Sequence, residues 1–527
     1  MRKHLFIIFI FALSTNVFGH NRVIKGKVVD SEYNTPVPYA AVYIQGTRYG
    51  DVTNNMGEFS LVVPDSIKSA ELVIAREEYK LKFIFISNIT DPGVTVILEP
   101  DNHEERLKML QDSLMGKQGG FVSFLNKAVD FVKDDWIPLG NPGTNRFDFG
   151  RIQTFPTYNS IEGLRLRAGF ASNSRLSPNL FLKGYGAYGF GDKRFKYRGE
   201  VTYSFDKKAY HEDEFPRNNV SLIYENDLFS PGEMHPRSAN DLLLITYMRS
   251  DNESVYRNFA EINYEREYKN GLAYTAWIRR SGMIPQGDLE FRYIDRDIVY
   301  DDELNTSEVG LQFRYSFREA YVQQKRKRRT LEATSPVIFL SHSIGKSEYL
   351  GEESAFHRTE LSVQKRFLLG YAGQLDVVGE VMKVWNSVPF PLLVYPNQRY
   401  RHHIENNAFF LSRALEFVAD EQVTLRATFV GDDLLLAKVP ILNQLLMREL
   451  ISLRASYGRL SDKNKPGNTV LYNFPQVSNE YGSVPYIEGT IGITNILGLL
   501  RVEYVHRFTY RDHPEALLGK IRVDITI

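Results

Sequence analysis

A pair of histidines and a nearby carboxylate give the sequence its most metal-like spacing: His402, His403 and Glu405. A histidine three residues before a glutamate is a spacing found in zinc sites, but a catalytic zinc also needs a third protein ligand. On a strand or in a loop, this spacing does not fix the geometry of the ligands either. We therefore predict no metal site and no bound cofactor. A hydrolase that uses one of these histidines with Glu405 at the rim of a larger fold stays the less favoured alternative.

A second pairing could supply a nucleophile and a base, namely His342 with Ser341 or Ser343. Adjacent side chains of a strand point to opposite faces, so this pairing fails if the segment is a strand. The sequence offers no other convincing set of nucleophile, base and orienting group. We predict that the protein has no catalytic residues and is not an enzyme.

Charged residues of both signs recur at alternate positions of the predicted strands, on the face opposite the apolar residues. These residues are Arg165, Arg167, Arg198, Glu200, Glu261, Glu265, Arg314, Arg318, Asp376, Glu380, Arg501, Glu503 and Arg522. Buried charge without a partner is costly, so mixed signs inside a closed sheet favour a network of ion pairs. The alternative is a wide diffusion pore, in which water would hydrate the same groups.

A dense basic run lies between two predicted strands, at Lys325, Arg326, Lys327, Arg328 and Arg329. Facing outward, it could bind the phosphates of lipopolysaccharide, because fixed positive charge near anionic head groups is favourable. A solvated turn is the simpler interpretation. Strand parity alone does not tell on which side of a membrane the run would lie.

The elements that carry these charges alternate in the manner of a transmembrane β-barrel. Val309, Leu311 and Phe313 alternate with Glu308, Gln312 and Arg314, and stretches of about ten residues repeat this pattern from Tyr274 to Ile527. Hydrocarbon leaves an open sheet edge unsatisfied, so such strands must close on themselves. We predict an antiparallel barrel of about sixteen strands. An aromatic-rich soluble β protein is the alternative.

Composition narrows the classes of function. The chain has 527 residues, with 64 Lys and Arg against 64 Asp and Glu, so no overall positive field favours nucleic acid as a partner. It has no cysteine, which excludes disulfides, zinc-thiolate sites and a lipid-anchored cysteine. The 31 Tyr and 34 Phe suit strands and the aromatic girdles of a membrane barrel.

Four regions are expected along the chain. Residues 1–19 have the basic start, short apolar stretch and small cleavage-site residues of a signal peptide. Residues 20–100 contain about six short strands and predict a small β-sandwich. Residues 101–145 have helical spacing and predict a helical linker, with a partial plug as the alternative. Residues 146–527 form the barrel domain, so the fold class is all-β. We expect an outer-membrane protein whose small domain is periplasmic.

Two resemblances agree with this division. Residues 24–30, 38–47 and 53–61 resemble the carboxypeptidase regulatory-like family, which implies a non-catalytic accessory domain. Residues 162–169, 440–450 and 486–504 are similar to an uncharacterised family of outer-membrane barrels from Bacteroidetes-type bacteria. That family joins a regulatory-like domain to a barrel. The resemblance implies fold and location and adds little chemistry.

The sequence thus favours a non-enzymatic role in envelope transport, surface assembly or organisation. The alternative is a binding or scaffold protein with a filled barrel, whose small domain holds a periplasmic protein partner through a sheet edge. A TonB-dependent transporter needs a plug longer than residues 100–145, and an insertase-type barrel needs βααββ repeats that residues 22–99 lack. The expected partners are therefore outer-membrane lipid and this periplasmic protein, with no nucleic acid.

Overall fold

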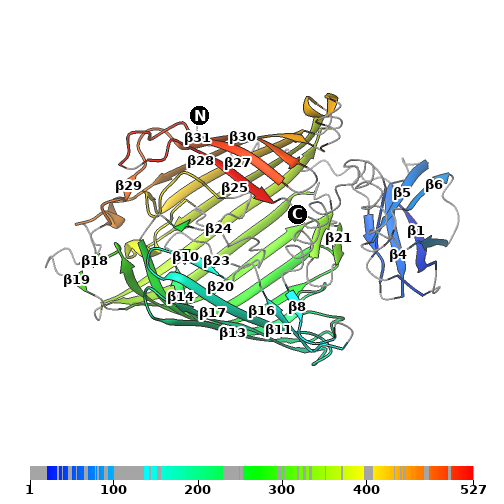
Figure 1. Cartoon of the computed structure of the whole chain (residues 1–527), viewed down its shortest axis with the longest axis horizontal. Coiled ribbons are helices and arrows are strands. Elements are labelled where there is room, and N and C mark those ends of the chain that lie inside the picture. The colour runs from blue at the N-terminus through cyan, green and yellow to red at the C-terminus, as the bar shows by residue number, and fades with distance from the viewer. Residues whose placement is uncertain are drawn as a thin grey trace, which may run out of the picture. The chain divides into compact units, whose positions relative to one another are not determined.

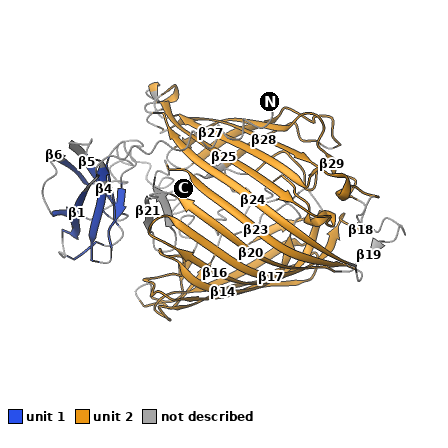
Figure 2. Cartoon of the chain, turned by 180° about the vertical axis from the view of Figure 1, so that it is seen from behind, with its two compact units in different colours: residues 1–116, 318–324, 328–332 blue, residues 117–317, 325–327, 333–527 orange. Residues whose placement is uncertain are grey.

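A computed structural model divides the chain into two compact units, which are coloured separately in Figure 2. One unit contains residues 1–116, 318–324 and 328–332, and the other contains the rest. The residues that the structure describes are 21–99 (without 32–34, 38–39, 45–49, 55, 65–68, 77–78, 80–81 and 88–92), 136–150 (without 142–143), 156–229, 248–249, 253–292, 299–300, 303–316, 320–323, 328–331, 335–349, 352–369, 372–396, 408–431, 434–439, 442, 445, 447–467, 474–496, 500–514 and 516–525. The predicted signal peptide and most of the predicted helical linker lie outside these residues.

The small domain consists of two sheets. In the first, β1 (Asn21–Asp30) lies between antiparallel β4 (Glu58–Pro64) and parallel β7 (Val94–Leu98). The second has the order β3 (Gly50–Val52), β2 (Ala41–Ile44), β5 (Ser69–Ala75) and β6 (Lys82–Ser87). Apolar residues of both sheets, such as Val28, Val42 and Leu72, are fully buried together. The six predicted strands are present, and β3 is an additional one that is too short for a period-two pattern.

One turn of this domain shows how the sequence fixes the backbone. The side chain of Asn54 accepts hydrogen bonds from the backbone N–H groups of Met56 and Glu58, both at 2.9 Å. Gly57 has φ +72°, and a Cβ there would lie 2.4 Å from the carbonyl oxygen of Val28. Only glycine fits this position without strain, so the turn that leads into β4 depends on it.

The second unit is one large sheet of 19 strands that curls into a barrel (Figure 1). Its long strands are antiparallel to their neighbours, as the pairing registers show. In the order of the sheet, the long strands are β11 (Gly163–Ser172), β12 (Leu180–Gly189), β13 (Phe195–Ser204), β14 (Asn218–Phe229), β16 (Glu253–Glu267), β17 (Leu272–Gly287), β20 (Leu304–Ser316), β23 (Val337–Tyr349), β24 (Glu352–Leu368), β25 (Gly373–Val384), β27 (Glu421–Gly431), β28 (Arg448–Arg459), β30 (Tyr486–Ile496), β31 (Leu500–Arg507) and β32 (Gly519–Ile525).

Short strands connect the last long strand of the sheet, β32, to the first one, β11. β8 (Trp136–Pro138) lies between β32 and β9 (Phe147–Gly150), and β9 pairs with β11. β10 (Thr157–Asn159) pairs with the same edge of β11, so β9 and β10 lie end to end along it. With the fifteen long strands, β8 and the position shared by β9 and β10 give seventeen positions among the described residues, close to the sixteen that the sequence predicts. A further two-residue strand, β15 (Met248–Arg249), pairs with β10.

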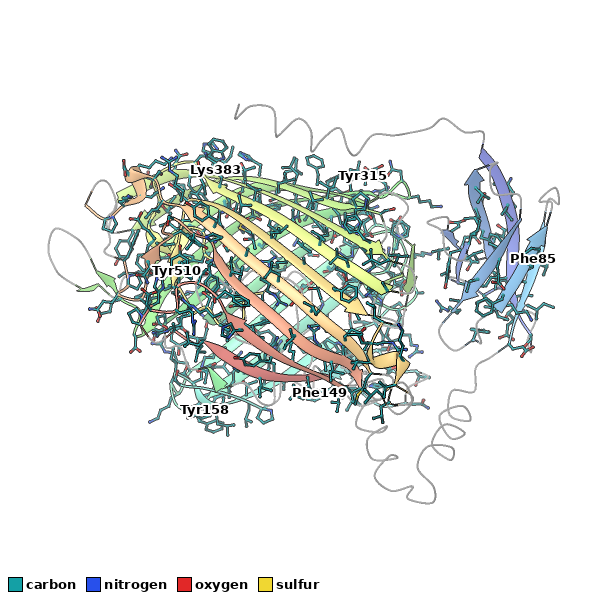
Figure 3. All side chains as sticks on the ribbon, turned by 90° about the horizontal axis from the view of Figure 1, so that it is seen from above. Phe85, Phe149, Tyr158, Tyr315, Lys383 and Tyr510 are labelled. Atoms are coloured by element: carbon teal, nitrogen blue, oxygen red, sulfur yellow. The ribbon has the colours of Figure 1, made fainter. Side chains whose placement is uncertain are left out.

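The barrel wall separates its side chains by strand parity. On the outer face, Val309, Leu311, Phe313 and Tyr315 of β20 are all more than a third exposed. Figure 3 shows Tyr315 at the outer surface of the barrel. Most lumen-facing positions are polar or charged and less exposed. An apolar outer face around a polar interior is typical of transmembrane β-barrels.

Chain direction assigns each connection to one end of the barrel. Residues 230–252, 288–303, 385–420 and 460–485 connect strands at one end, here called the loop end. The other end, called the turn end, has the short connections 268–271, 369–372 and 497–499, and both β9 and β32 begin or finish there. The connection 317–336 also leaves and rejoins the barrel wall at the turn end. Its hairpin of β21 (Ala320–Gln323) and β22 (Arg328–Leu331) belongs to the other compact unit.

Three further pieces of secondary structure lie in the loop-end connections: the pair β18 (Phe291–Arg292) and β19 (Val299–Tyr300), the pair β26 (Phe417–Val418) and β29 (Asn479–Glu480), and short 3-10 turns such as η3 (Phe390–Leu392). In the described part of the chain, we find no helix with the length and apolar character needed to cross a bilayer.

Candidate functional site in the barrel lumen

Lumen-facing charges of the first barrel strands pair with one another. Arg165 makes two hydrogen bonds of 2.7 Å to the carboxylate of Asp227, and Glu162 is 3.2 Å away. Arg198 lies 2.8 Å from Glu225 and 3.1 Å from Glu200. These contacts join β11, β13 and β14 across the inner face of the sheet. Because the groups are mostly buried, each charge depends on its partner.

The same arrangement continues around the wall. The guanidinium of Arg279 on β17 makes two hydrogen bonds, of 2.7 and 3.0 Å, to Glu308 on β20, and these two residues are directly opposite in the strand register. Other pairs, with their shortest N–O distances, are Arg217–Glu265 (2.8 Å), Arg279–Glu261 (4.0 Å), Arg366–Asp376 (2.7 Å), Arg426–Glu380 (2.8 Å), Arg501–Glu503 (2.7 Å) and Arg522–Glu503 (2.6 Å).

Two predicted lumen residues contact aromatic rings. The guanidinium of Arg167 lies 3.7 Å from the ring centre of Tyr185, and that of Arg314 lies 5.6 Å from the ring centre of Phe339. Arg318 and the basic residues 325–327 lie outside the described residues, as do His402, His403 and Glu405. Arg328 and Arg329 begin β22.

The connection between β25 and β27 enters the lumen. We call its described residues, 386–396 and 408–420, the inner segment. Phe410 and Leu411 donate their backbone N–H groups to Glu488 on β30, and Arg413 reaches Glu253 on β16 at 3.6 Å. β30 and β16 lie about half-way round the sheet order from each other. The inner segment therefore crosses the lumen from one wall to the other.

An aromatic ring between two arginines anchors this crossing. The ring centre of Phe410 is 4.4 Å from the guanidinium of Arg454 on β28 and 3.7 Å from that of Arg522 on β32. Arg454 is almost completely buried, and its polar contacts are the hydroxyls of Ser452 and Thr490. A desolvated guanidinium over an aromatic face is favourable, so Phe410 supplies Arg454 with an interaction that the wall lacks.

A buried ion pair holds the end of the inner segment. Glu416 receives hydrogen bonds from Arg507 on β31, one of them 3.2 Å long, and the His513 ring nitrogen is 2.9 Å away. The ring of Phe417 packs on those of Tyr481 and Tyr486, with centres 4.9 and 4.8 Å apart. These contacts fix the segment to the wall at the loop end of the barrel.

Near the start of the connection, residues 388–395 pack on the opposite wall. Val388, Phe390, Leu393 and Val394 are buried together with lumen-facing residues such as Phe356 of β24. Tyr395 donates its hydroxyl to the carbonyl of Phe390 at 2.6 Å. Burial raises the pKa of Tyr395 well above its usual range, so this donor stays protonated.

A cavity of about 380 Å³ lies inside the barrel against the inner segment. Its walls come from β14, β16, β17, β20, β23, β24 and β25, and residues 391–395 of the inner segment border it. The lining combines aromatic side chains with charged ones: three arginines, at positions 257, 279 and 358, and three glutamates, at positions 308, 360 and 380. This is the size and mixed character of a small-molecule site.

The alternative catalytic residues do not come together. Ser341 is buried and lines the cavity, whereas His342 points to the outer face, where its ring contacts Thr359 at 2.9 Å. Within the described residues, no group of three or more His, Asp or Glu side chains is arranged to hold a metal ion.

The sequence missed several residues of the lumen. Glu308 is on the predicted polar face but was not assigned to the charge network, and Arg279 follows the same parity as the predicted charges, so parity alone could have found this pair. Glu416, Arg507 and Arg454 gain their importance from the inner segment, whose local sequence has no periodic signal for entering a barrel.

Comparison with protein families agrees with the two units. Residues 24–105 match the CarboxypepD_reg-like domain, and residues 141–381 match the C-terminal domain of a family of unknown function, DUF5686. No curated protein has a matching sequence.

Solved structures similar to the chain include outer-membrane barrels, at low identity. BamA from Haemophilus ducreyi, lacking POTRA domains 1–3, has a TM-score of 0.43 at 12% identity, over 83% of this chain and 88% of that one. CdiB from Escherichia coli has a TM-score of 0.39 at 10% identity, over 82% and 77%. OccK3 from Pseudomonas aeruginosa has a TM-score of 0.29 at 11% identity, over 69% and 90%. The family matches identify residues 24–105 as a CarboxypepD_reg-like domain and residues 141–381 as a DUF5686 C-terminal domain.

Proposed function

We propose that the protein is an outer-membrane β-barrel whose lumen is closed to free diffusion, and that it acts by binding and organising envelope components without covalent chemistry. The observation that carries this proposal is the inner segment, which spans the lumen between β30 and β16. A barrel of about sixteen strands is wide enough for a water-filled channel, so its interior needs such a filling to be closed.

The outer face supports the location. Residues such as Ile262, Ile278, Ile344 and Ile491 are about half exposed or more, and they project from the middle of their strands. A continuous belt of exposed apolar side chains would aggregate in water but is stable in lipid. The three longest connections, 230–252, 385–420 and 460–485, are all at the loop end, and the turn end carries both termini of the barrel. We therefore propose that the turn end faces the periplasm and that the small domain is periplasmic.

This orientation bears on the basic run at residues 325–329. The run belongs to the connection between β20 and β23, which is at the turn end. It would then face the periplasmic side rather than the lipopolysaccharide of the outer surface. We accordingly propose the inner leaflet or a periplasmic protein as the partner on this side.

The closed lumen is testable by conductance in planar bilayers. We expect the full chain to give no stepwise currents. A variant in which a short Gly-Ser linker replaces residues 386–416 should conduct, because it lacks most of the contacts that cross the lumen. A chain without residues 20–130 serves as the control: it retains β8 and the inner segment, and it should stay silent.

Stepwise currents through the full chain would overturn the proposal. Currents only in the control that lacks residues 20–130 would assign closure to the amino-terminal region instead of the inner segment. Each variant must first show the heat-dependent gel shift of a folded barrel.

A further inference from the structure

The lumen face of β24 presents a row of polar groups to the cavity. Phe356, Arg358, Glu360, Ser362 and Gln364 all line it, because alternate residues of a strand share a face. Successive members of the row are separated by about 6.6 to 6.8 Å along the strand. The row therefore offers a positive group, a negative group and two neutral hydrogen-bonding groups in sequence.

Arg358 and Glu360 differ from the other charged residues of the cavity. Arg257, Arg279, Glu308 and Glu380 each have a partner of opposite charge on the wall. Among the described residues, Arg358 and Glu360 form no ion pair. Two other arginines of the lumen bond to the glutamate two residues later, Arg198 to Glu200 at 3.1 Å and Arg501 to Glu503 at 2.7 Å. The spacing of Arg358 and Glu360 permits such a pair, but they do not form it.

The inner segment explains this difference. Arg358 donates from Nη2 to the backbone carbonyl of Leu392 at 2.6 Å, which draws the guanidinium toward the inner segment. Its Nε atom is buried and has no hydrogen-bond partner in the structure, and the same is true of the Ser362 hydroxyl. A buried charge-bearing donor without a partner is costly, and a ligand that supplies an acceptor would offset the cost.

The remaining surface of the cavity is largely apolar. Phe229, Phe259, Phe339 and Met283 line it together with Leu393 of the inner segment. The three arginines and three glutamates of the lining balance in charge. A ligand that matches this surface has no net charge, carries one anionic and one cationic group close together, and has an apolar body.

We propose that the lumen cavity binds a small zwitterion with an apolar side chain, the chemistry of an apolar amino acid or short peptide. Arg358 binds its carboxylate, Glu360 binds its ammonium group, and Ser362 bonds to a polar atom between or beside them. This inference rests on the proposed function, because a closed lumen is what desolvates the site and strengthens both charged contacts.

Calorimetric titration of the full chain in detergent micelles tests the proposal. The probes are the dipeptide phenylalanyl-leucine, its N-acetylated form and its C-terminal amide. The unmodified dipeptide should bind, and each blocked form should bind at least about tenfold more weakly, because each loses a charge-assisted hydrogen bond. This comparison uses only the unaltered protein.

Two variants then assign the contacts. Arg358→Gln should weaken binding of the dipeptide and remove its advantage over the amide. Glu360→Gln should weaken binding of the dipeptide and remove the advantage of the dipeptide over the acetylated form. Glu353→Gln is the matched control, because Glu353 is on the same strand but pairs with Lys346 at the exposed end, away from the cavity; its affinity should equal that of the unaltered chain.

Absence of binding, equal binding of all three probes, or variants that keep full discrimination would each overturn the assignment. The conductance experiment is independent of these results. A silent barrel that binds none of the probes would retain the closed lumen and reject the zwitterion, whereas an open pore would reject the closed lumen itself.

Discussion

At the scale of single residues, the lumen depends on charges whose partners are supplied by neighbouring strands. Arg279 and Glu308 illustrate this, since their side chains are only 11% and 10% exposed and bond through two parallel contacts. Removing one member leaves the other charged and largely buried, which is more costly than the pair itself is favourable.

We expect Arg279→Met to lower the free energy of unfolding by about 3 to 5 kcal/mol. The double variant Arg279→Met with Glu308→Leu should regain part of that loss, because it removes the carboxylate that Arg279 bonds directly and leaves only Glu261, 4.0 Å from Arg279, without its cation. Urea unfolding of the barrel in lipid vesicles measures both values.

A more exposed pair with similar geometry provides the comparison. Arg366 and Asp376 also share two hydrogen bonds, but their side chains are 30% and 21% exposed. Arg366→Met should therefore cost clearly less than Arg279→Met. Equal losses at the two sites would contradict burial as the cause.

At the scale of elements, strand parity separates lipid-facing from lumen-facing residues, and the register aligns them across strands. Ile262, Ile278, Val309 and Ile344 are neighbours in one such row on the outer face. Alternation of this kind is visible in the sequence, which is why the barrel and its approximate strand number could be predicted. The strand β3 and the short strands at the junction of the barrel are too brief to leave a pattern.

Placing a charge in this outer row should be costly only in a membrane. We expect Ile278→Lys to destabilise the barrel in lipid vesicles by about 2 to 4 kcal/mol, the range for Lys near the bilayer midplane. In detergent micelles, which adapt around a charge, the loss should be smaller. Leu435→Lys, at an exposed position in the connection between β27 and β28, should have almost no effect. A loss at Leu435 as large as that at Ile278 would argue against this row as the membrane-facing surface.

At the scale of the whole barrel, the lumen is closed by the inner segment, which was not predicted from the sequence. The inner segment lacks both helical and strand periodicity, and it contacts strands far away in the chain, as Glu416 with Arg507 shows. Non-local contacts of this kind leave no local signal. The sequence predicted that charges of the barrel wall would pair. It did not predict that residues 391–395 of the inner segment border a cavity, or that the polar row on β24 lines it.

Phe410 lets the closure be tested with one substitution. Phe410→Ala removes the ring between Arg454 and Arg522 and should weaken attachment of the inner segment by about 2 kcal/mol or more. We expect brief stepwise currents in planar bilayers where the unaltered chain is silent. Phe410→Tyr keeps the aromatic face and should behave as the unaltered chain does; if Phe410→Ala is equally silent, the ring is not what holds the segment.

The three-residue strand β8 also constrains how the barrel is completed. It joins β32, near the carboxyl end of the chain, to β9, which precedes every long strand of the barrel. Contacts between distant parts of a chain close the largest loops and form slowly. The sheet can therefore be finished only after its last strand is available, and until then it presents two unpaired edges to other chains. Assembly rate, rather than final stability, should be the property most sensitive to changes in residues 136–138.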